Sequence, residues 1–420
     1  MSNSALQLSV PGIDADRLVE RFLRYVAIDT RAVPDAPTYP SNPNERVLGQ
    51  LLVEELKALG LSDAVLDEHG YVMATLAGNR PAPLIGFIAH LDTAAETPGA
   101  DVKPLIRRNY QGEPLRFPGN PDLVLSLETS PALATAIGQD LITTDGTTLL
   151  GGDDKAGIAI IMAALEALVA HPEWPHGDLR IAFTPDEELG EGTRYFDIPR
   201  FGARYAYTVD GEAAAEFNDE TFNASGATLT ITGLNVHPGK AKGVMVNAIQ
   251  VLGDFLAMLP RDLTPQETEG REGFVHPTEV QGGVEAASLR LIVRDFDLEG
   301  LAAKERLLLE AVLALRERHP RAQIELELTP SYRNMRSYLD EAPQVTELAL
   351  QALVEAGLTP ERVPLRGGTD GSALSCRGVL TPNLFTGSGN HHGLTEWASI
   401  QQMTQAAEVV VRLARLWTGV

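Results

Sequence analysis

The sequence contains a single cysteine, Cys376, among its 420 residues. An internal disulfide is therefore excluded, and the chain fits a reducing compartment. The neighbouring sequence TDGSALS predicts a small buried thiol without catalytic chemistry. No apolar run of about 18 residues is present that could span a membrane. The first thirty residues carry charges where a signal peptide would be apolar. We therefore expect a cytoplasmic protein.

Basic side chains are scarce. The chain has 34 Lys and Arg against 57 Asp and Glu, which gives a net charge of −23. Without a Lys/Arg cluster to neutralise phosphates, we expect no nucleic-acid partner. An acidic surface can weakly attract a substrate with a free amino group. The length exceeds what one hydrophobic core usually supports, so we expect two domains.

Short apolar segments alternate with helical segments in the first half of the chain. The segment APLIGFIAH predicts a buried strand, KAGIAIIMAALEALVAH a helix packed on a sheet, and LRIAF and ARYAYTV two further strands. This alternation is typical of an α/β fold with a mixed sheet flanked by helices. In such folds, functional sites gather at the carboxyl ends of the strands.

The pattern changes after about residue 220. Alternating strands and two helical segments follow in the order β-α-β-β-α-β, which predicts an antiparallel sheet with two helices on one face. From Tyr332 the α/β pattern returns. We therefore predict a catalytic domain in two parts, residues 1–220 and 330–420, with a smaller α+β lid domain, residues 221–329, inserted between them.

Histidine and acidic residues occur at the ends of these predicted strands and in two loops. They are His90, Asp92, Asp153, Asp154, Glu187, Glu188, Asp210 and His392. Each motif alone is weak evidence, because HLD is more often a capped strand end, DDK a solvated turn and DEE a helix start. Together, imidazoles and carboxylates suit zinc, and this set would hold two ions if one carboxylate bridged them.

Several longer motifs carry a family resemblance. They are TTDGTTLLGGDDKAG, FTPDEELGEGT, DGEAAAEFNDETFNAS, NVHPGKAKGVMVNA, RGGTDGSALS and NLFTGSGNHHG. In this order the chain resembles the dinuclear-zinc exopeptidases, and within them the aminotripeptidase branch, peptidase T. The same family includes acetylornithine and succinyl-diaminopimelate deacylases. The resemblance covers nearly the whole chain, from about Asp29 to the final helix.

The resemblance implies a ligand set for two zinc ions. One ion would be held by His90, Asp153 and Asp210, and the other by Asp153, Glu188 and His392. Asp153 would be the bridge. His391 and His392 are not separated by spacing alone; His392 is preferred because Gly393 and Glu396 follow it as in the family. The intervening Leu394 and Thr395 depart from the more polar residues usual there.

The resemblance also assigns roles to residues beside the ligands. Asp92 would orient the imidazole of His90, and Glu187 would be the general base beside the ligand Glu188. Asp186 is expected to be structural. Arg366, Arg333, His237 and Asn247 match positions that contact the peptide or its oxyanion, although each also fits an ordinary surface or turn residue.

The implied function is removal of the N-terminal residue from tripeptides, with small peptides as substrates and with neither nucleic acid nor membrane as a partner. Two alternatives stay open: a related dinuclear-zinc amidohydrolase, such as an N-acyl amino acid deacylase or dipeptidase, and a non-catalytic metal- or peptide-binding protein. Retention of Glu187 beside Glu188 favours catalysis. The resemblance leaves the oligomeric state open between monomer and homodimer.

Overall fold

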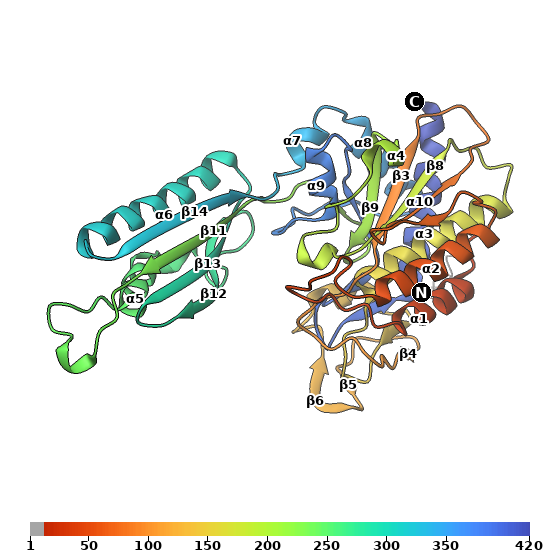
Figure 1. Cartoon of the computed structure of the whole chain (residues 1–420). Coiled ribbons are helices and arrows are strands. Elements are labelled where there is room, and N and C mark those ends of the chain that lie inside the picture. Colours follow the sequence, from red (N-terminus) through yellow and green to blue (C-terminus); the bar gives the residue numbers. More distant parts are fainter. Residues whose placement is uncertain (1–11) are drawn as a thin grey trace. The chain divides into compact units, whose positions relative to one another are not determined.

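The computed structural model describes residues 12–420. Residues 1–11, which begin the first predicted domain and the segment predicted to lack a signal peptide, lie outside the described residues. The chain divides into two compact units (Figure 1). The larger comprises the described residues up to Asp219, with Ser337–Val363 and Thr369–Val420; the smaller comprises Glu220–Arg336 and Pro364–Gly368. Glu220 and segments 330–336 and 364–368, which the sequence pattern assigned to the catalytic domain, thus belong to the smaller unit.

The larger unit is built on an eight-stranded mixed sheet with the order β1-β2-β8-β3-β9-β16-β10-β15. The strands are β1 (Val65–Leu66), β2 (Val72–Leu76), β3 (Ile85–His90), β8 (Leu179–Thr184), β9 (Tyr205–Gly211), β10 (Glu216–Asn218), β15 (Glu361–Arg362) and β16 (Asn383–Phe385). At its centre, β8, β3, β9 and β16 are parallel neighbours. Their carboxyl ends therefore lie along one edge.

Helices cover this sheet. The longer ones are α1 (Ala15–Val26), α2 (Asn44–Ala58), α3 (Gly152–Ala170), α8 (Gln344–Glu355) and α10 (Ile400–Leu416); α4 (Ile198–Phe201), α7 (Arg336–Leu339) and α9 (Asp370–Cys376) are short. Helix α3 packs against β3 and β9 and is buried almost all round. A helix that is apolar on every face is stable only inside a protein, which explains its run of Ala, Ile and Leu.

The larger unit also contains small sheets that the sequence did not predict. Strands β17 (Ser388–Gly389), β18 (Trp397–Ser399), β7 (Leu141–Thr143) and β4 (Leu105–Arg107) form one, and β5 (Leu115–Phe117) with β6 (Asn120–Leu125) forms another. The prediction of a buried thiol was wrong: Cys376 is exposed, because it ends the short helix α9. Within residues 12–420, no helix combines the length and the apolar character that crossing a membrane requires.

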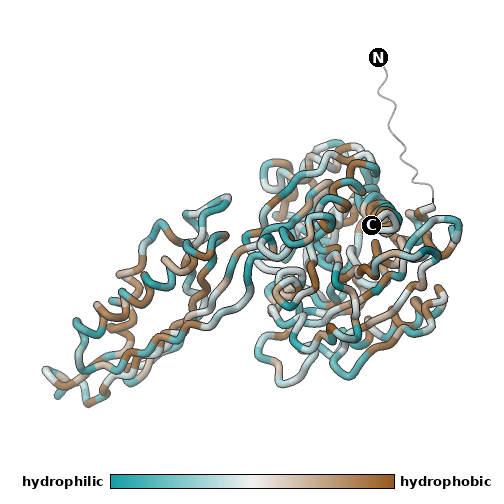
Figure 2. Tube along the Cα trace, turned by 90° about the horizontal axis from the view of Figure 1, so that it is seen from above, coloured by the Kyte–Doolittle hydropathy of each residue, from teal (hydrophilic) through white to brown (hydrophobic). Residues whose placement is uncertain are grey.

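The smaller unit has the predicted order of elements. Strand β11 (Asn223–Thr232) is followed by α5 (Ala248–Met258), β12 (Phe274–Gly282), β13 (Ala286–Asp295), α6 (Leu298–Arg318) and β14 (Gln323–Pro330). The four strands form an antiparallel sheet in the order β12-β13-β11-β14. Both helices pack on this sheet and on each other, around a core that includes Leu229, Phe255 and Leu308. Figure 2 shows hydrophobic segments in both units.

Candidate active site and metal centre

Two neighbouring strands deliver the first site residues to one edge of the main sheet. His90 is the last residue of β3, and Asp210 lies next to the last residue of β9. Glu187 and Glu188 begin a short 3-10 turn that follows β8, which ends at Thr184, after two intervening residues. Because β8, β3 and β9 run parallel and side by side, their following residues converge. The sheet therefore groups side chains that are far apart in the sequence.

The two carboxylate oxygens of Asp153 face different histidines: Oδ1 faces His90, whereas Oδ2 faces both His391 and His392. Oδ1 lies 2.9 Å from Nε2 of His90, and Oδ2 lies 3.2 Å from Nε2 of His392. Around this carboxylate, His90 Nε2 is 3.5 Å from Asp210 Oδ1, and His392 Nε2 is 3.0 Å from Glu188 Oε2. The structure thus brings together all five residues that the sequence nominated as ligands.

The donor set fits cations. Burial, together with the charge of Asp153, raises the pKa of Asp210 to about 6 and that of Glu188 to about 7. Among the described residues, Glu188 Oε1 is buried without a hydrogen-bond partner. Crowded carboxylates with raised pKa values and an unpaired acceptor are stabilised when a cation binds. Mixed nitrogen and oxygen donors suit zinc, cobalt and manganese.

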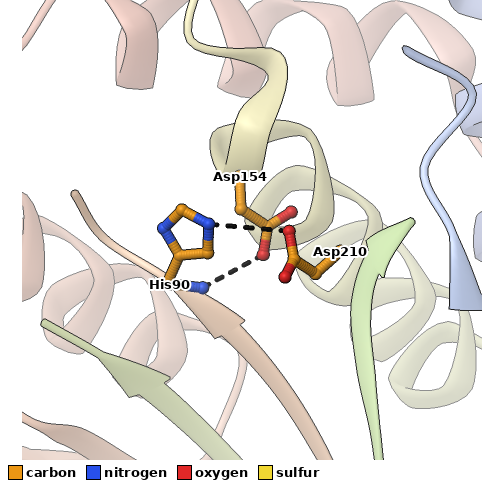
Figure 3. Close-up of side chains that lie close together, drawn as sticks. All are labelled: His90, Asp154 and Asp210. Atoms are coloured by element: carbon orange, nitrogen blue, oxygen red, sulfur yellow. Dashed lines mark hydrogen bonds and ion pairs between the residues drawn. The ribbon is translucent and has the colours of Figure 1, made fainter. Parts of the chain in front are cut away.

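Asp154 also lies in this cluster but makes different contacts. Together with His90 and Asp210 it forms a group that could hold a metal (Figure 3). However, its Oδ2 accepts the backbone N–H of His90 at 3.0 Å, and its Oδ1 accepts that of Gly157 at 3.2 Å. Burial and the charge of Asp210 raise the pKa of Asp154 well above its usual range. Because both oxygens of Asp154 accept backbone N–H groups, Asp153 is the better candidate for a carboxylate that bridges two metal ions.

Asp92 supports three of these residues from behind. It is fully buried, and its Oδ1 lies 3.2 Å from Nδ1 of His90. Its two oxygens separately accept the backbone N–H groups of Glu187 and Glu188, each at 3.0 Å. One carboxylate therefore fixes both an imidazole and the turn that carries the paired glutamates, an arrangement in which a ligand is oriented by its neighbour.

The paired glutamates have different environments. Glu188 contacts His392, as described above, whereas no side-chain hydrogen bond of Glu187 occurs within residues 12–420. Burial is the largest effect on Glu187, and with the charge of Asp210 it raises the pKa well above the usual range. Glu187 is therefore a carboxylate that holds a proton more readily than an exposed glutamate does.

The two adjacent histidines also differ. His392 reaches both Asp153 and Glu188, whereas Nδ1 of His391 lies 3.2 Å from Asp153 Oδ2 and its Nε2 lies 2.7 Å from Ser388 Oγ. Ser388 continues a hydrogen-bond chain through Thr386, whose hydroxyl donates to the carbonyl of Gly211. One nitrogen of His391 is thus occupied by the protein, and His392 is the histidine shared between Asp153 and Glu188.

The four predicted substrate-binding residues belong to the smaller unit. Arg366 donates from Nη1 to the carbonyls of Gly270 and Glu272, and from Nη2 to the carbonyl and hydroxyl of Thr268. Arg333 donates to the carbonyls of Ala224 and Tyr332. Arg366 and Arg333 therefore both use N–H donors for hydrogen bonds within the smaller unit.

The other two predicted substrate-binding residues make local contacts. The exposed His237 accepts the N–H of Gly239, and Asn247 caps α5 by accepting the N–H of Ile249. A turn or cap contact of this kind is also made by ordinary surface residues. Their geometry is thus compatible with both roles.

Several buried acids of the larger unit have no functional role in the sequence interpretation. Glu396 accepts three backbone N–H groups, and Asp370 accepts the hydroxyl of Thr184 at 2.6 Å. Asp186 accepts the N–H of Ser41 at 2.7 Å, and its own N–H donates to Glu45, so it links the active-site turn to the start of α2. Only the spacing of Glu396 from His392 gave a sequence signal.

Comparisons with known proteins show the family and the fold of this chain. The family described as "Peptidase family M20/M25/M40" matches residues 146–416. A peptidase T of Geobacillus sp. (strain WCH70) is 46% identical over 404 residues, which cover 96% of this chain and 98% of that protein. Among solved structures, a tripeptidase from Staphylococcus aureus subsp. aureus Mu50 has a TM-score of 0.75 at 22% identity, covering 97% of this chain and 100% of that chain.

A more distant structure shares the fold. A Bacillus subtilis protein described as a dinuclear metal-binding peptidase of the M20 family has a TM-score of 0.62 at 14% identity, covering 96% of this chain and 97% of that chain. The predicted family resemblance is therefore confirmed by a family match and by a curated relative, and the fold by solved structures. The chain belongs to peptidase family M20/M25/M40.

Proposed function

We propose that this chain is a zinc-dependent aminopeptidase that removes the N-terminal residue of tripeptides. The 46% identity with a peptidase T over nearly the full length of both chains supports this activity. One observation carries the mechanism: the two oxygens of Asp153 face His90 and His392 separately, at 2.9 and 3.2 Å. A carboxylate in this position can serve two metal ions at once.

His90, Asp153 and Asp210 would hold one zinc ion, and Asp153, Glu188 and His392 the other. A pair of zinc ions would supply a water molecule of lowered pKa and polarise the scissile carbonyl. Asp92 would keep His90 in the orientation and tautomer that leave Nε2 free for the metal. Cobalt or manganese would fit the same donors, so zinc is the part of this proposal that metal analysis tests.

Glu187 would be the general base. Its carboxylate would take the proton of the attacking water and then return it to the amine of the departing peptide. The raised pKa of Glu187 supports this, because a carboxyl group whose pKa is raised keeps a transferred proton more readily than an ordinary glutamate and can then return it. Arg366, Arg333, His237 and Asn247 are proposed to contact the peptide or its oxyanion.

Turnover of small peptides tests the proposal. The zinc-loaded protein should cleave trialanine much faster than dialanine, tetra-alanine or an N-acetylated amino acid. Cleavage of the acetylated substrate alone would favour a related amidohydrolase and overturn the tripeptidase assignment. Binding of zinc and peptide without any turnover would favour a non-catalytic protein. We further propose a cytoplasmic location, from the single cysteine and its fit to a reducing compartment.

A further inference from the structure

Glu396 is a buried acid that the mechanism above does not use. Only 1% of it is exposed, and it follows His392 by four residues. Its Oε2 accepts the backbone N–H groups of Leu150 and Gly151, each at 2.7 Å, and its Oε1 accepts that of Asp153 at 3.0 Å. Its carboxylate therefore binds the backbone of residues 150–153, which lie 243 to 246 residues earlier in the sequence.

The segment held by Glu396 has an irregular backbone. Gly151 has φ +79°, in the left-handed region, and Asp153 has non-helical angles of φ −83° and ψ 104° at the start of α3. Such a segment has no helical hydrogen bonds to fix its N–H groups. Three bonds to one carboxylate replace them, and the bond to Asp153 N–H fixes the residue whose side chain faces His90 and His392.

The chain also leaves space for this contact. A Cβ added to Gly152 would lie 3.0 Å from Glu396 Oε1 and 3.3 Å from Cβ of Ser388. The absence of a side chain at position 152 thus lets the carboxylate approach the Asp153 backbone. Gly152 has no positive φ, so the close approach explains the glycine better than backbone conformation does.

Burying a carboxylate in this cluster is costly. Burial raises the pKa of Glu396, even though His391 and the backbone N–H groups of Asp153 and Gly151 lower it. A neutral side chain could close an ordinary loop without this penalty. A carboxylate, however, presents two acceptor oxygens in one rigid plane, and it holds three donors at fixed positions. The cost of burying this carboxylate is therefore explained by a need to hold Asp153 in place to within a fraction of an ångström.

We infer that Glu396 is a positioning residue for the bridging carboxylate of Asp153, and that metal affinity depends on it. This inference rests on the two-zinc centre proposed above. Glu396 acts through the backbone of residues 150–153, without touching metal or substrate. The segment 392–396 therefore contributes twice to the centre, once through the imidazole of His392 and once through Glu396.

Glu396→Gln tests the inference selectively. The amide has a single acceptor oxygen. If this oxygen keeps Leu150 and Gly151, the new NH₂ group faces the N–H of Asp153, and the anchor of the bridging residue is lost. We expect zinc affinity, measured on metal-free protein by competition with a chelator, to fall about 10- to 100-fold. The absorption spectrum of the cobalt-substituted protein should change as well, because ligand geometry at cobalt changes.

Asp67→Asn is the matched control. Asp67 Oδ1 likewise accepts two backbone N–H groups, those of His69 and Tyr71, but it contacts none of the proposed ligands. This variant should keep wild-type zinc affinity and the wild-type cobalt spectrum, even if its melting temperature falls. If Glu396→Gln behaves in the same way, with lower stability and unchanged zinc affinity and spectrum, Glu396 is only structural and the inference is overturned.

Gly152→Ala provides a second variant if Glu396→Gln does not fold. Its methyl group would push Glu396 Oε1 away from Asp153 while both carboxylates stay in the chain. Weaker zinc binding in Gly152→Ala supports the inference, and unchanged binding overturns it. Zinc binding by the wild-type protein distinguishes failure of the proposed metal centre from failure of the role of Glu396. A wild-type protein that binds no zinc overturns the metal centre. Two zinc ions bound equally by wild type and variants overturn only the role of Glu396.

Discussion

Oδ1 of Asp92 lies 3.2 Å from Nδ1 of His90 in the core of the larger unit. Because His90 is fully engaged on this side, only Nε2 faces Asp153 and Asp210. Asp92→Ala should therefore lower zinc affinity by about 10- to 100-fold. Chelator competition on the metal-free protein measures this. Unchanged affinity in Asp92→Ala would show that the strand alone orients His90.

The paired glutamates should separate chemistry from metal binding. Glu187→Ala is expected to keep about two zinc ions per chain and to lose about 10²- to 10⁴-fold in turnover, because it removes the proposed base. Glu188→Ala should instead lose zinc from one site, because Glu188 contacts His392. Metal content after gel filtration and kcat on trialanine measure both. Equal zinc loss in the two variants would contradict the division of roles.

The adjacent histidines predict a second contrast. His392→Ala should lose one zinc ion per chain, because its Nε2 lies within 3.2 Å of both Asp153 and Glu188. His391→Ala should keep both ions, because Nε2 of His391 is occupied by Ser388 and only Nδ1 reaches Asp153. Zinc content of the two variants, each checked for folding by circular dichroism, decides between them. The reverse result would make His391 the ligand.

Removal of metal should make stability depend on pH. In the folded chain the pKa of Glu188 is raised to about 7 by burial and Asp153, and that of Asp210 to about 6. Acids with raised pKa destabilise the fold at high pH, and this loss disappears as pH falls through the folded pKa towards the unfolded value. Hydrogen bonds with Asp153 and Glu188 raise the pKa of His392 to about 11, so its stabilising contribution also grows as pH falls.

Both effects have the same sign. The protein treated with EDTA should therefore melt at a higher temperature at about pH 6 than at about pH 8. Added zinc should raise the melting temperature more at the higher pH, because the metal then replaces the missing protons. Differential scanning fluorimetry at both pH values, with EDTA or with zinc, measures this. A metal-free protein that is more stable at the higher pH would contradict the expectation.

Arg366 offers a test of the substrate residues. Its Nη1 and Nη2 donate to residues 268–272, and its guanidinium lies 5.4 Å from the ring centre of Phe222. Arg366→Lys should therefore lower the free energy of unfolding by about 1 to 3 kcal/mol, since a lysine cannot reproduce the fork. Arg290→Lys, at an exposed ion pair with Glu279, is the control and should change stability little. Urea unfolding and KM for trialanine are measured together; a raised KM with unchanged stability would favour direct contact with the peptide.

The order of the elements could be read from the sequence because periodicity is a local property. The apolar run before His90 and the alternating residues of β11 each predict a strand from no more than ten consecutive residues. The small sheets could not be predicted. Strands such as β4 and β7 have three residues each, too few to show a period, and their pairing depends on partners elsewhere in the chain.

In the site, too, local sequence patterns could be recognised and long-range contacts could not. The residues nominated as metal ligands stand at strand ends or in long motifs, so their spacing was visible. Glu396 and Asp154 were not given roles, because each acts on backbone groups that only the fold brings near. The contacts of Arg366 were hidden for the same reason: its partners near Thr268 are about a hundred residues away, with no shared motif. Long-range contacts between side chain and backbone leave almost no trace in a single sequence.

The proposed ligands enter the chain at very different times during translation. Asp153, Glu188 and Asp210 leave the ribosome long before His392 and Glu396, which come much later in the sequence. Until then, the carboxylates of the three acids lack the imidazole of His392, and residues 150–153 lack their hydrogen bonds to Glu396. A nascent chain or a product of early termination would therefore keep the acids without a complete metal site. Zinc uptake would then report that synthesis had passed Glu396.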